Sequence, residues 1–340
     1  MARHLLTLAD FTAAELLHLL ERARAVKAAA PRYVRALYEK TLLMIFETPS
    51  LRTRLSFETA MTQLHGHAIN YYTVHSPWGV GKESIEDFAR TVSRYCDGVA
   101  ARVFSHDDLC RFAAAASVPV INAMTNGGHP CQALGDLLTI GERLGRVSGF
   151  TMAYAGDACN NVTYSLMRAS VKFGFDLRIA CPDLAEYRPA PEVMCELERI
   201  RECLGRVEIV GDLQAAAAGA DVVYTDSWMS YRIPPEHEER RRRDLGPYRV
   251  TADVMARAAQ SAVFMHCLPA SRGMETTAEV IDGPRSIVFD QAENRLHVEK
   301  AILLELLGGS ATAAAAHRDP GRDVQAGGRA SPYPAGPTRP

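Results

Sequence analysis

The chain has 340 residues, which is long for one hydrophobic core and favours two domains. It carries 38 lysine and arginine residues against 40 aspartate and glutamate residues, for a formal net charge of −2, so composition gives no general reason to expect a nucleic acid or an anionic membrane as partner. The apolar stripe of residues 1–20 is interrupted by His4, Asp10, Glu15 and His18, a pattern that fits neither a signal peptide nor a membrane span. We therefore expect a cytoplasmic protein.

Along the chain, short apolar runs rich in β-branched residues alternate with segments of helical period. Strands are predicted at 41–47, 68–74, 98–104, 119–125, 151–157, 176–182, 207–211, 221–227, 262–269 and 286–291. Alternation of this kind is typical of parallel sheets covered by helices on both faces, and this many strands suits two sheets better than one. The predicted fold class is α/β, with two doubly wound parallel-sheet domains joined by bridging helices.

The predicted boundary between the domains lies where a long helical segment, residues 133–147, begins. We assign residues 1–132 to the first domain and residues 133–292 to the second, with a last helix, 293–308, returning to the first. Residues 309–340 are rich in Gly, Pro and Ala and contain few large apolar side chains, so they are expected to be disordered.

The cysteines give no metal or disulfide pattern. The eight positions 96, 110, 131, 159, 181, 195, 203 and 267 include no Cys-x-x-Cys pair, so neither a zinc site nor a disulfide framework is expected. The segment GDACNN, 156–161, joins a strand to a helix but has a single glycine, which does not fit the dinucleotide-binding pattern, and the chain has no P-loop. No cofactor and no metal are predicted, and Asn160 is expected to cap a helix.

An anion site is predicted where the first strand gives way to a helix. Ser50 has the position of a helix N-cap, and the apolar residues after it recur on one helical face. Free backbone N–H groups and the helix dipole favour an anion there, and Arg52 and Thr53 add a guanidinium and a hydroxyl in the first turn. A phosphate group fits this site. An isolated Arg-Thr-Arg triplet on a solvated surface has the same composition, so other residues must support the assignment.

Three further polar side chains lie at strand ends. His129 and Gln132 follow the strand 119–125 in a Gly-Gly loop that leads into a helix, and Arg102 lies near the end of the strand 98–104. Side chains at the carboxyl ends of strands line the crevice where α/β sheets bind ligands. Both His129 and Gln132 can donate to a carbonyl oxygen, although a loop histidine with an ordinary partner has the same pattern. Arg102, charged within a strand of buried type, needs an anionic or strongly polar partner.

The run HEERRRRD, 237–244, concentrates four arginines. Acidic residues flank them on both sides, so we expect a solvated helix face and not a nucleic-acid surface.

Three separated motifs make the chain similar to the aspartate/ornithine carbamoyltransferases, over about residues 3 to 308. The segment Ser50–Arg54 resembles the carbamoyl phosphate loop of that family, His129-Pro-Cys-Gln132 resembles its carbonyl-polarising pair, and His266-Cys-Leu-Pro269 resembles the acceptor motif of the ornithine branch. The segment DQAENRLH, 290–297, is also ornithine-like.

The resemblance implies a transfer of the carbamoyl group from carbamoyl phosphate to the side-chain amine of L-ornithine or a related amino acid, giving citrulline or a ureido analogue and phosphate. It implies binding of carbamoyl phosphate by Ser50, Leu51, Arg52, Thr53 and Arg54, action on its carbamoyl group by Thr53, Arg102, His129, Gln132 and Arg295, and acceptor binding by Asn161, Asp226, Ser230, Tyr231, Cys267 and Leu268. For Arg54 the family implies a role in supporting the loop as readily as a contact with the donor. Asp226 and Cys267 are also expected to assist the attack, without a covalent intermediate, and Leu268-Pro269 resembles the cis peptide of the family.

Two departures from the ornithine pattern leave the acceptor open. Ser230-Tyr231-Arg232 stands where ornithine enzymes have Ser-Met-Gly, and Trp78 stands where they carry a polar residue that reaches the carbamoyl phosphate site of a neighbouring subunit. Tryptophan there resembles the N-acylornithine enzymes. The alternatives are the same chemistry on putrescine, an N-acylornithine or a shorter diamino acid, and a catalytically silent homologue. The family also implies a homotrimer with shared active sites.

Overall fold

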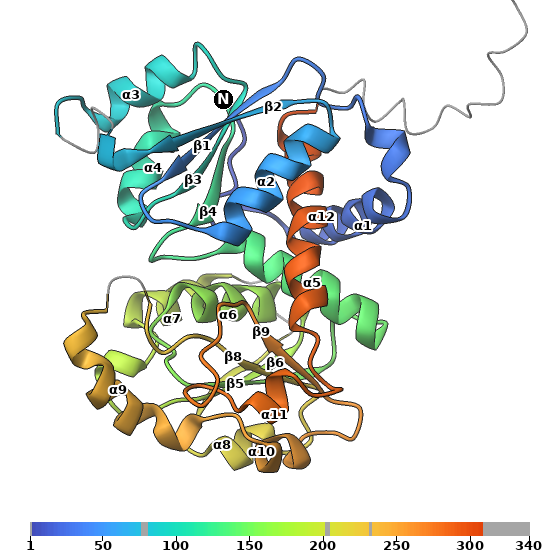
Figure 1. The fold of residues 1–340 in the computed structure, drawn as a ribbon, viewed down its shortest axis with the longest axis vertical. Helices are drawn as coiled ribbons and strands as arrows, with labels where there is room; N and C mark the ends of the chain where they lie inside the picture. The colour runs from blue at the N-terminus through green and yellow to red at the C-terminus, as the bar shows by residue number, and fades with distance from the viewer. Residues whose placement is uncertain (1, 76–80, 201–204, 231–232, 309–340) are drawn as a thin grey trace, which may run out of the picture. The chain divides into compact units, whose positions relative to one another are not determined.

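The computed structural model describes residues 2–75, 81–200, 205–230 and 233–308. The first sheet is parallel and has the order β2-β1-β3-β4. Its strands are β1 (Thr41–Phe46), β2 (His67–Tyr72), β3 (Gly98–Arg102) and β4 (Val120–Met124), and the helices that connect them are α2 (Leu51–Gln63), α3 (Ile85–Val92) and α4 (His106–Ala115). Figure 1 shows these elements grouped together in the blue to green part of the chain.

The second sheet is also parallel, with the order β7-β6-β5-β8-β9. Its strands are β5 (Thr151–Ala155), β6 (Asp176–Ala180), β7 (Val207–Val210), β8 (Val222–Thr225) and β9 (Val263–His266). The helices around it are α6 (Asn161–Phe173), α7 (Pro191–Arg199), α8 (Leu213–Ala217), α9 (Glu238–Leu245), α10 (Ala252–Arg257) and α11 (Ala278–Ile281). Short 3₁₀ turns lie at 8–10, 30–33, 73–75, 185–187, 235–237 and 246–248.

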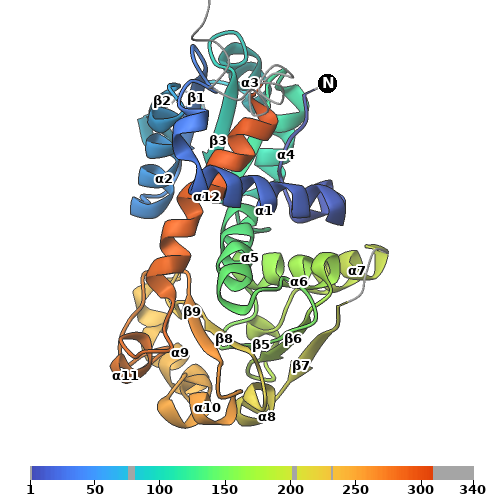
Figure 2. The same cartoon turned by 90° about the vertical axis from the view of Figure 1, so that its right-hand side faces the viewer.

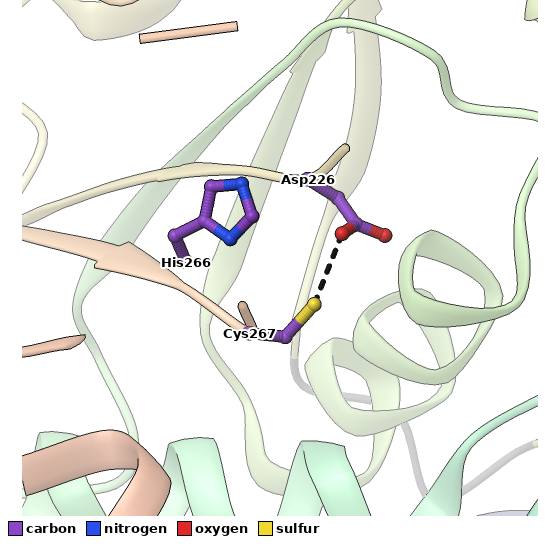
Figure 3. Close-up of side chains that lie close together, drawn as sticks. All are labelled: Asp226, His266 and Cys267. Atoms are coloured by element: carbon purple, nitrogen blue, oxygen red, sulfur yellow. Dashed lines mark hydrogen bonds between the residues drawn. The ribbon is translucent and has the colours of Figure 1, made fainter. Parts of the chain in front are cut away.

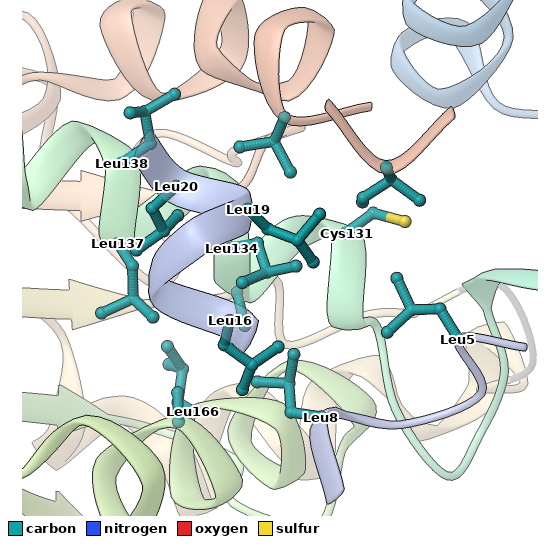
Figure 4. Packing of buried hydrophobic residues seen from close by; sticks show 14 of the residues in the cluster. Leu5, Leu8, Leu16, Leu19, Leu20, Cys131, Leu134, Leu137, Leu138 and Leu166 are labelled. Carbon is teal, nitrogen blue, oxygen red and sulfur yellow. The ribbon is translucent and has the colours of Figure 1, made fainter. Parts of the chain in front are cut away.

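Three long helices, α1 (Ala13–Ala28), α5 (Pro130–Leu144) and α12 (Val288–Leu306), pack against one another, and α5 leads from β4 of the first sheet to β5 of the second. α12 packs against α1, α2 and α5, although it follows them by far in the sequence (Figure 2). Leucines of α1, among them Leu16 and Leu20, interdigitate with Leu134 and Leu138 of α5 in one continuous buried cluster (Figure 4). Burial of such side chains stabilises the fold by about 1.5–3 kcal/mol each. This cluster fixes α5 and α12, which both carry predicted site residues.

Local sequence explains where the site-bearing helices begin and end. The Ser50 side chain caps α2, and Asn160 caps α6 by accepting from the Thr163 N–H at 2.9 Å, which confirms the capping role expected for Asn160. Gly145 and Gly174 end α5 and α6 with φ of 71° and 76°, in the left-handed region that favours glycine. A short loop separates each of α2, α5 and α6 from the strand before it.

The predicted fold class is confirmed, since both sheets are parallel and carry helical connections. The predicted strand 286–291 is wrong. Ser286 makes a single isolated bridge to Phe264, and α12 already begins at Val288. The apolar run of Ile287 and Val288 buries its side chains, but the helix-forming residues after it continue as a helix.

The predicted domain boundary, between residues 132 and 133, falls inside α5. The assignment of residues to the two domains on either side of it stays a prediction. The disorder expected of 309–340 concerns residues outside the described part of the chain. Among the residues that the structure describes, no helix is both long enough and apolar enough to cross a bilayer.

Both sheets have a point where the strand order reverses. In the first sheet it lies between β1 and β3, and in the second it lies between β5 and β8. Parallel α/β sheets bind ligands in the crevice beyond the carboxyl ends of strands at such points. Ser50, Arg102, Asn161 and Asp226 follow or end these four strands.

Candidate active site

A cavity of ≈ 270 Å³ lies at these strand ends and is lined by residues from both sheets and from α12. Twelve of the predicted site residues line it: Ser50, Arg52, Thr53, Arg102, His129, Gln132, Asn161, Asp226, Ser230, Cys267, Leu268 and Arg295. Met124, Val162, Ser227, Met229 and Pro269 complete the lining. Sequence reasoning singled out the charged and amide groups but not these neighbours, because small and apolar residues at strand ends carry no distinct signal.

The start of α2 forms one end of the cavity. The Ser50 hydroxyl accepts from the Thr53 N–H at 3.4 Å, and the Arg52 side chain lines the cavity. Leu51 is 68 % exposed and does not line the cavity, so its contact with the donor stays a prediction. Arg54 lies outside this lining, where its Nε donates to Glu58 Oε2 at 3.3 Å. The two arginines of the motif therefore have different surroundings.

The Thr53 hydroxyl lies between two buried guanidinium groups. Arg102 Nη1 and Arg295 Nη2 each donate to Thr53 Oγ1 at 3.4 Å, and both arginines are less than a tenth exposed, at 8 % and 2 %. Arg102 therefore has the strongly polar neighbour that was predicted for a charged side chain in a buried strand. Together with Arg52 they give this end of the cavity an excess of positive charge, which favours an anion.

His129 is the residue before α5 and its ring is buried. Its backbone N–H donates to Ser165 Oγ at 2.7 Å, and its Nε2 lies 3.5 Å from Arg295 Nη1. Burial lowers the pKa of His129 well below its usual value, and the charges of Arg295 and Arg102 lower it further. The imidazole is therefore neutral near pH 7 and can donate one N–H to a carbonyl oxygen. The role of His129 on a carbonyl oxygen stays a prediction, supported by its buried ring and its contact with Arg295.

Gln132 connects Arg295 to a buried carboxyl group. Its Oε1 accepts from Arg295 Nη1 at 2.7 Å, and its Nε2 donates to Asp136 Oδ1 at 2.8 Å. Asp136 also accepts from Gln291 Nε2 at 2.7 Å and from the Tyr224 hydroxyl at 3.1 Å. Burial raises the pKa of Asp136 to about 6 despite these donors. The direct donation from Gln132 to a carbonyl oxygen stays a prediction, while its amide also orients Arg295.

Asp226 and Cys267 line the cavity directly after β8 and β9, and Figure 3 shows their side chains pointing toward one another. Cys267 Sγ donates to Asp226 Oδ1 at 3.0 Å. Burial raises the pKa of Cys267 well above its usual value, and Asp226 raises it further, so the thiol is protonated and does not act as a thiolate nucleophile. After it, Leu268 has a positive φ of 59° and a cis peptide to Pro269, as the resemblance implied.

The side chains of Asp226, His266 and Cys267 are of metal-ligand type, and their donor atoms lie within 4.8 Å of one another. Both nitrogens of His266 already have partners: Nδ1 accepts from the Leu268 N–H at 2.8 Å, and Nε2 lies 3.2 Å from Glu275 Oε1. A metal here would have to displace one of these contacts and the thiol proton. The geometry favours a hydrogen-bonded wall over a metal centre.

Two predicted site residues, Trp78 and Tyr231, lie outside the described residues.

Arg241 is a residue that the sequence interpretation assigned wrongly. It belongs to the run 237–244 that was expected to face solvent, yet it is 6 % exposed, whereas the side chains of Arg240, Arg242 and Arg243 are 44–74 % exposed. Its Nε donates to the Trp228 carbonyl at 2.6 Å and its Nη2 donates to Asp157. No signal within a run of four arginines distinguishes the buried one.

Arg241 thereby connects two loops on the side of the cavity that Asp226 lines. Trp228 lies between Ser227 and Met229, which line the cavity, and Asp157 precedes the capped start of α6. Burial raises the pKa of Asp157, and Arg241 opposes that rise. A buried ion pair of this kind holds both loops in one arrangement.

The comparisons with known proteins agree with this geometry. Residues 3–142 match the family model for the aspartate/ornithine carbamoyltransferase carbamoyl-P binding domain, and residues 148–306 match the model for the Asp/Orn binding domain. An ornithine carbamoyltransferase of Pyrococcus abyssi is 45% identical over 313 residues, covering 91% of this chain and 97% of the relative. An anabolic ornithine carbamoyltransferase of Pyrococcus furiosus is 45% identical over 310 residues, covering 90% and 97%.

Solved structures of ornithine carbamoyltransferases also match this fold over most of the chain. The ornithine carbamoyltransferase from Pyrococcus furiosus superposes with a TM-score of 0.84 at 43% identity, covering 91% of this chain and 98% of that one. The ornithine transcarbamoylase from Giardia lamblia superposes with a TM-score of 0.83 at 40% identity, covering 90% and 98%. The chain belongs to the aspartate/ornithine carbamoyltransferase family.

Proposed function

We propose that this carbamoyltransferase transfers the carbamoyl group of carbamoyl phosphate to the side-chain amine of L-ornithine, giving citrulline and phosphate. One observation carries the proposal: the cavity has a cationic end around Thr53 and, facing it, a wall with the Asp226 carboxylate and the Cys267 thiol. The first suits an anionic donor and the second suits an amine.

The donor needs two things from the site. Carbamoyl phosphate carries a dianionic phosphate, which the backbone N–H groups at the start of α2 and the Arg52 guanidinium would bind. Its carbonyl is a weak electrophile, and donors that strengthen as negative charge develops on oxygen lower the barrier to attack. Thr53, Arg102 and neutral His129 supply such donors, because they converge in a cavity wall from which most water is excluded.

The acceptor amine must lose its proton before it attacks. A side-chain ammonium with a pKa near that of lysine costs about 3 kcal/mol to deprotonate at about pH 8. The Asp226 carboxylate accepts a hydrogen bond from the amine and orients it. As the C–N bond forms and the C–O bond breaks, the departing phosphate takes the second amine proton, so no covalent enzyme intermediate is required.

Ornithine is preferred to the other amines because relatives at 45% identity over nearly their whole length are named ornithine carbamoyltransferases. The departures at 230–232 and Trp78 keep putrescine, N-acylornithines and shorter diamino acids as alternatives. A panel assay with carbamoyl phosphate and each amine, scoring ureido product and phosphate, distinguishes them. L-Ornithine is expected to have the highest kcat/KM. A higher value for another amine would replace ornithine, and no product with any amine would support a catalytically silent homologue.

Replacing Asp226 with asparagine is expected to lower kcat/KM for the acceptor by about 100-fold, because the amide is a weaker acceptor for the amine and also loses the charge. The affinity for carbamoyl phosphate, measured by calorimetry, should change less than threefold. Asp183→Asn, at a side chain that is 86% exposed, is the matched control. An equal loss of donor affinity in Asp226→Asn would contradict a role on the acceptor side.

We also propose a cytoplasmic homotrimer whose sites are shared between subunits, working in the synthetic direction in arginine biosynthesis. The name of the Pyrococcus furiosus relative supports the direction, and seven unpaired cysteines among the described residues fit a reducing compartment.

The proposed sharing of active sites between subunits rests on the resemblance at Trp78. Light scattering measures the assembly, and trimers mixed from Trp78→Ala and Arg52→Ala chains are expected to recover part of the activity. Verified mixed trimers without any recovery would argue against sharing.

A further inference from the structure

A fully buried carboxylate lies against one of the arginines of the site. Glu299 follows Arg295 by one turn of α12, and the side chain of Glu299 is 0 % exposed. Its Oε1 accepts from Arg295 Nε at 3.1 Å and from Arg295 Nη2 at 2.7 Å. Its Oε2 is buried and makes no hydrogen bond of ordinary geometry among the described residues; the Ser56 hydroxyl, which also acts on Glu299, donates to the Arg52 carbonyl at 2.7 Å. A buried carboxylate with one unsatisfied oxygen is costly to the fold, so its presence beside a site residue calls for an explanation.

The guanidinium that Glu299 contacts is the one that spans the cavity wall. Arg295 Nη1 donates to Gln132 at 2.7 Å, and Arg295 Nη2 reaches Thr53 at 3.4 Å. Two nitrogens of Arg295 are thus held by Glu299, and the geometry toward Gln132 and Thr53 follows from that contact. Without an acceptor at position 299, nothing else among the described hydrogen bonds fixes Arg295 Nε.

We propose that Glu299 is a positioning residue for the carbamoyl transfer proposed above: it holds Arg295 side-on toward Thr53 and Gln132, and it takes up a proton from solvent when the dianionic donor binds. The proposal rests on the proposed function for its kinetic part only. Its second part concerns donor binding and needs no acceptor amine.

The direction of the proton movement follows from the charges around Glu299. Burial raises the pKa of Glu299 to about 7, against the opposing effects of Arg295 on the same helix and the Ser56 hydroxyl on α2. A further titratable neighbour among the described residues is the Cys131 thiol on α5, which burial keeps protonated by raising its pKa far above the usual range. Dianionic carbamoyl phosphate bound in the cavity that Arg295 lines adds a like charge on the Glu299 side of the site, and this favours the protonated carboxyl. At about pH 7.5 the free protein therefore has a largely ionised Glu299 that becomes protonated as the donor binds.

Two substitutions separate the parts of the proposal. Glu299→Gln keeps an acceptor oxygen for Arg295 but cannot titrate, so kcat/KM for carbamoyl phosphate is expected to stay within about threefold of the wild type. Glu299→Leu removes the acceptor, and kcat/KM is expected to fall by about 10- to 100-fold. Glu305→Gln, on the same helix and partly exposed, is the matched control. Thermal melts and circular dichroism identify the folded variants.

Proton uptake is measured by calorimetric titration of the full-length protein with carbamoyl phosphate at about pH 7.5. Two buffers of different ionisation enthalpy are compared, which gives the number of protons that the protein takes up as the donor binds. The wild type and Glu305→Gln are expected to take up on the order of half a proton per site more than Glu299→Gln. Equal proton uptake in all three would overturn the proton part, and a folded Glu299→Leu with wild-type kcat/KM would overturn the positioning part. A wild type that binds carbamoyl phosphate but carbamoylates no amine would refute the proposed function and leave the proton count valid.

Discussion

Replacing Arg52 with glutamine is expected to weaken the binding of carbamoyl phosphate by about 100-fold and to lower kcat/KM by at least as much. The Arg52 side chain lines the cavity at the first turn of α2, where backbone N–H groups and the helix dipole already favour an anion. A charge-assisted hydrogen bond to phosphate in such a site contributes about 1.5–3 kcal/mol, and glutamine retains neither the charge nor the forked geometry. Calorimetry with carbamoyl phosphate measures the first effect and steady-state kinetics the second.

Arg54→Gln is the matched control for this prediction. Arg54 lies two residues later in the same helix, carries the same charge, and pairs with Glu58 at 3.3 Å outside the cavity. Its replacement is expected to change the dissociation constant by less than about twofold, since exposed ion pairs of this kind contribute little. Equal losses in the two variants would mean that the net charge of the helix, and not the position of Arg52, determines donor affinity.

Replacing Arg241 with methionine is expected to lower the free energy of unfolding by about 3–5 kcal/mol, because the Asp157 carboxylate then remains buried without its cationic partner. Arg241 connects Asp157 to the loop 226–230, from which Asp226 and Ser230 line the cavity, so the KM for the acceptor amine should rise by about tenfold in the folded protein. Denaturant unfolding measures the stability, and initial rates at saturating carbamoyl phosphate measure the KM.

Arg242→Met provides the control, because the adjacent side chain is 52% exposed and pairs only with Glu238 at 3.0 Å among the described salt bridges. A further variant that combines Arg241→Met with Asp157→Asn should recover part of the stability, since the amide costs less to bury than an unpaired charge. Recovery of stability without recovery of the acceptor KM is the expected pattern. A wild-type KM in Arg241→Met would show that the ion pair stabilises the fold without positioning the acceptor loops.

Much of the fold follows from local patterns in the sequence. Strands such as Thr41–Phe46 are buried on both faces and bounded by polar residues, which is the pattern of a parallel sheet. The segment 286–291 has the same apolar appearance, yet only Ser286 pairs with β9 before α12 begins. A short apolar run does not reveal whether a neighbouring strand edge continues beside it, so periodicity alone could not decide between strand and helix.

The site was predictable where a side chain's role depends on its own strand or helix. Ser50 and Arg52 follow from a helix start, and Arg102 and Asp226 follow from strand ends. The roles of Glu299 and Arg241 could not be predicted in this way. Glu299 acts through Arg295, one helical turn away, and through the contact of Arg295 with Gln132. Arg241 acts through Asp157, which is distant in the sequence. Burial of a charge depends on tertiary packing. The sequence around Arg241 or Glu299 does not show which charged residue of the helix is buried.

The central claim is that one cavity binds an activated carbamoyl donor at its cationic end and an amine at the wall opposite. The most direct measurement is the stoichiometry of the reaction, with citrulline and phosphate quantified in parallel for the purified full-length protein supplied with carbamoyl phosphate and L-ornithine. We predict one citrulline for each phosphate released by the enzyme, with a turnover in the usual range of about 1–10³ s⁻¹, and loss of both products together in Arg52→Gln. Phosphate release without any ureido product, or citrulline formation that is unchanged in Arg52→Gln, would contradict it.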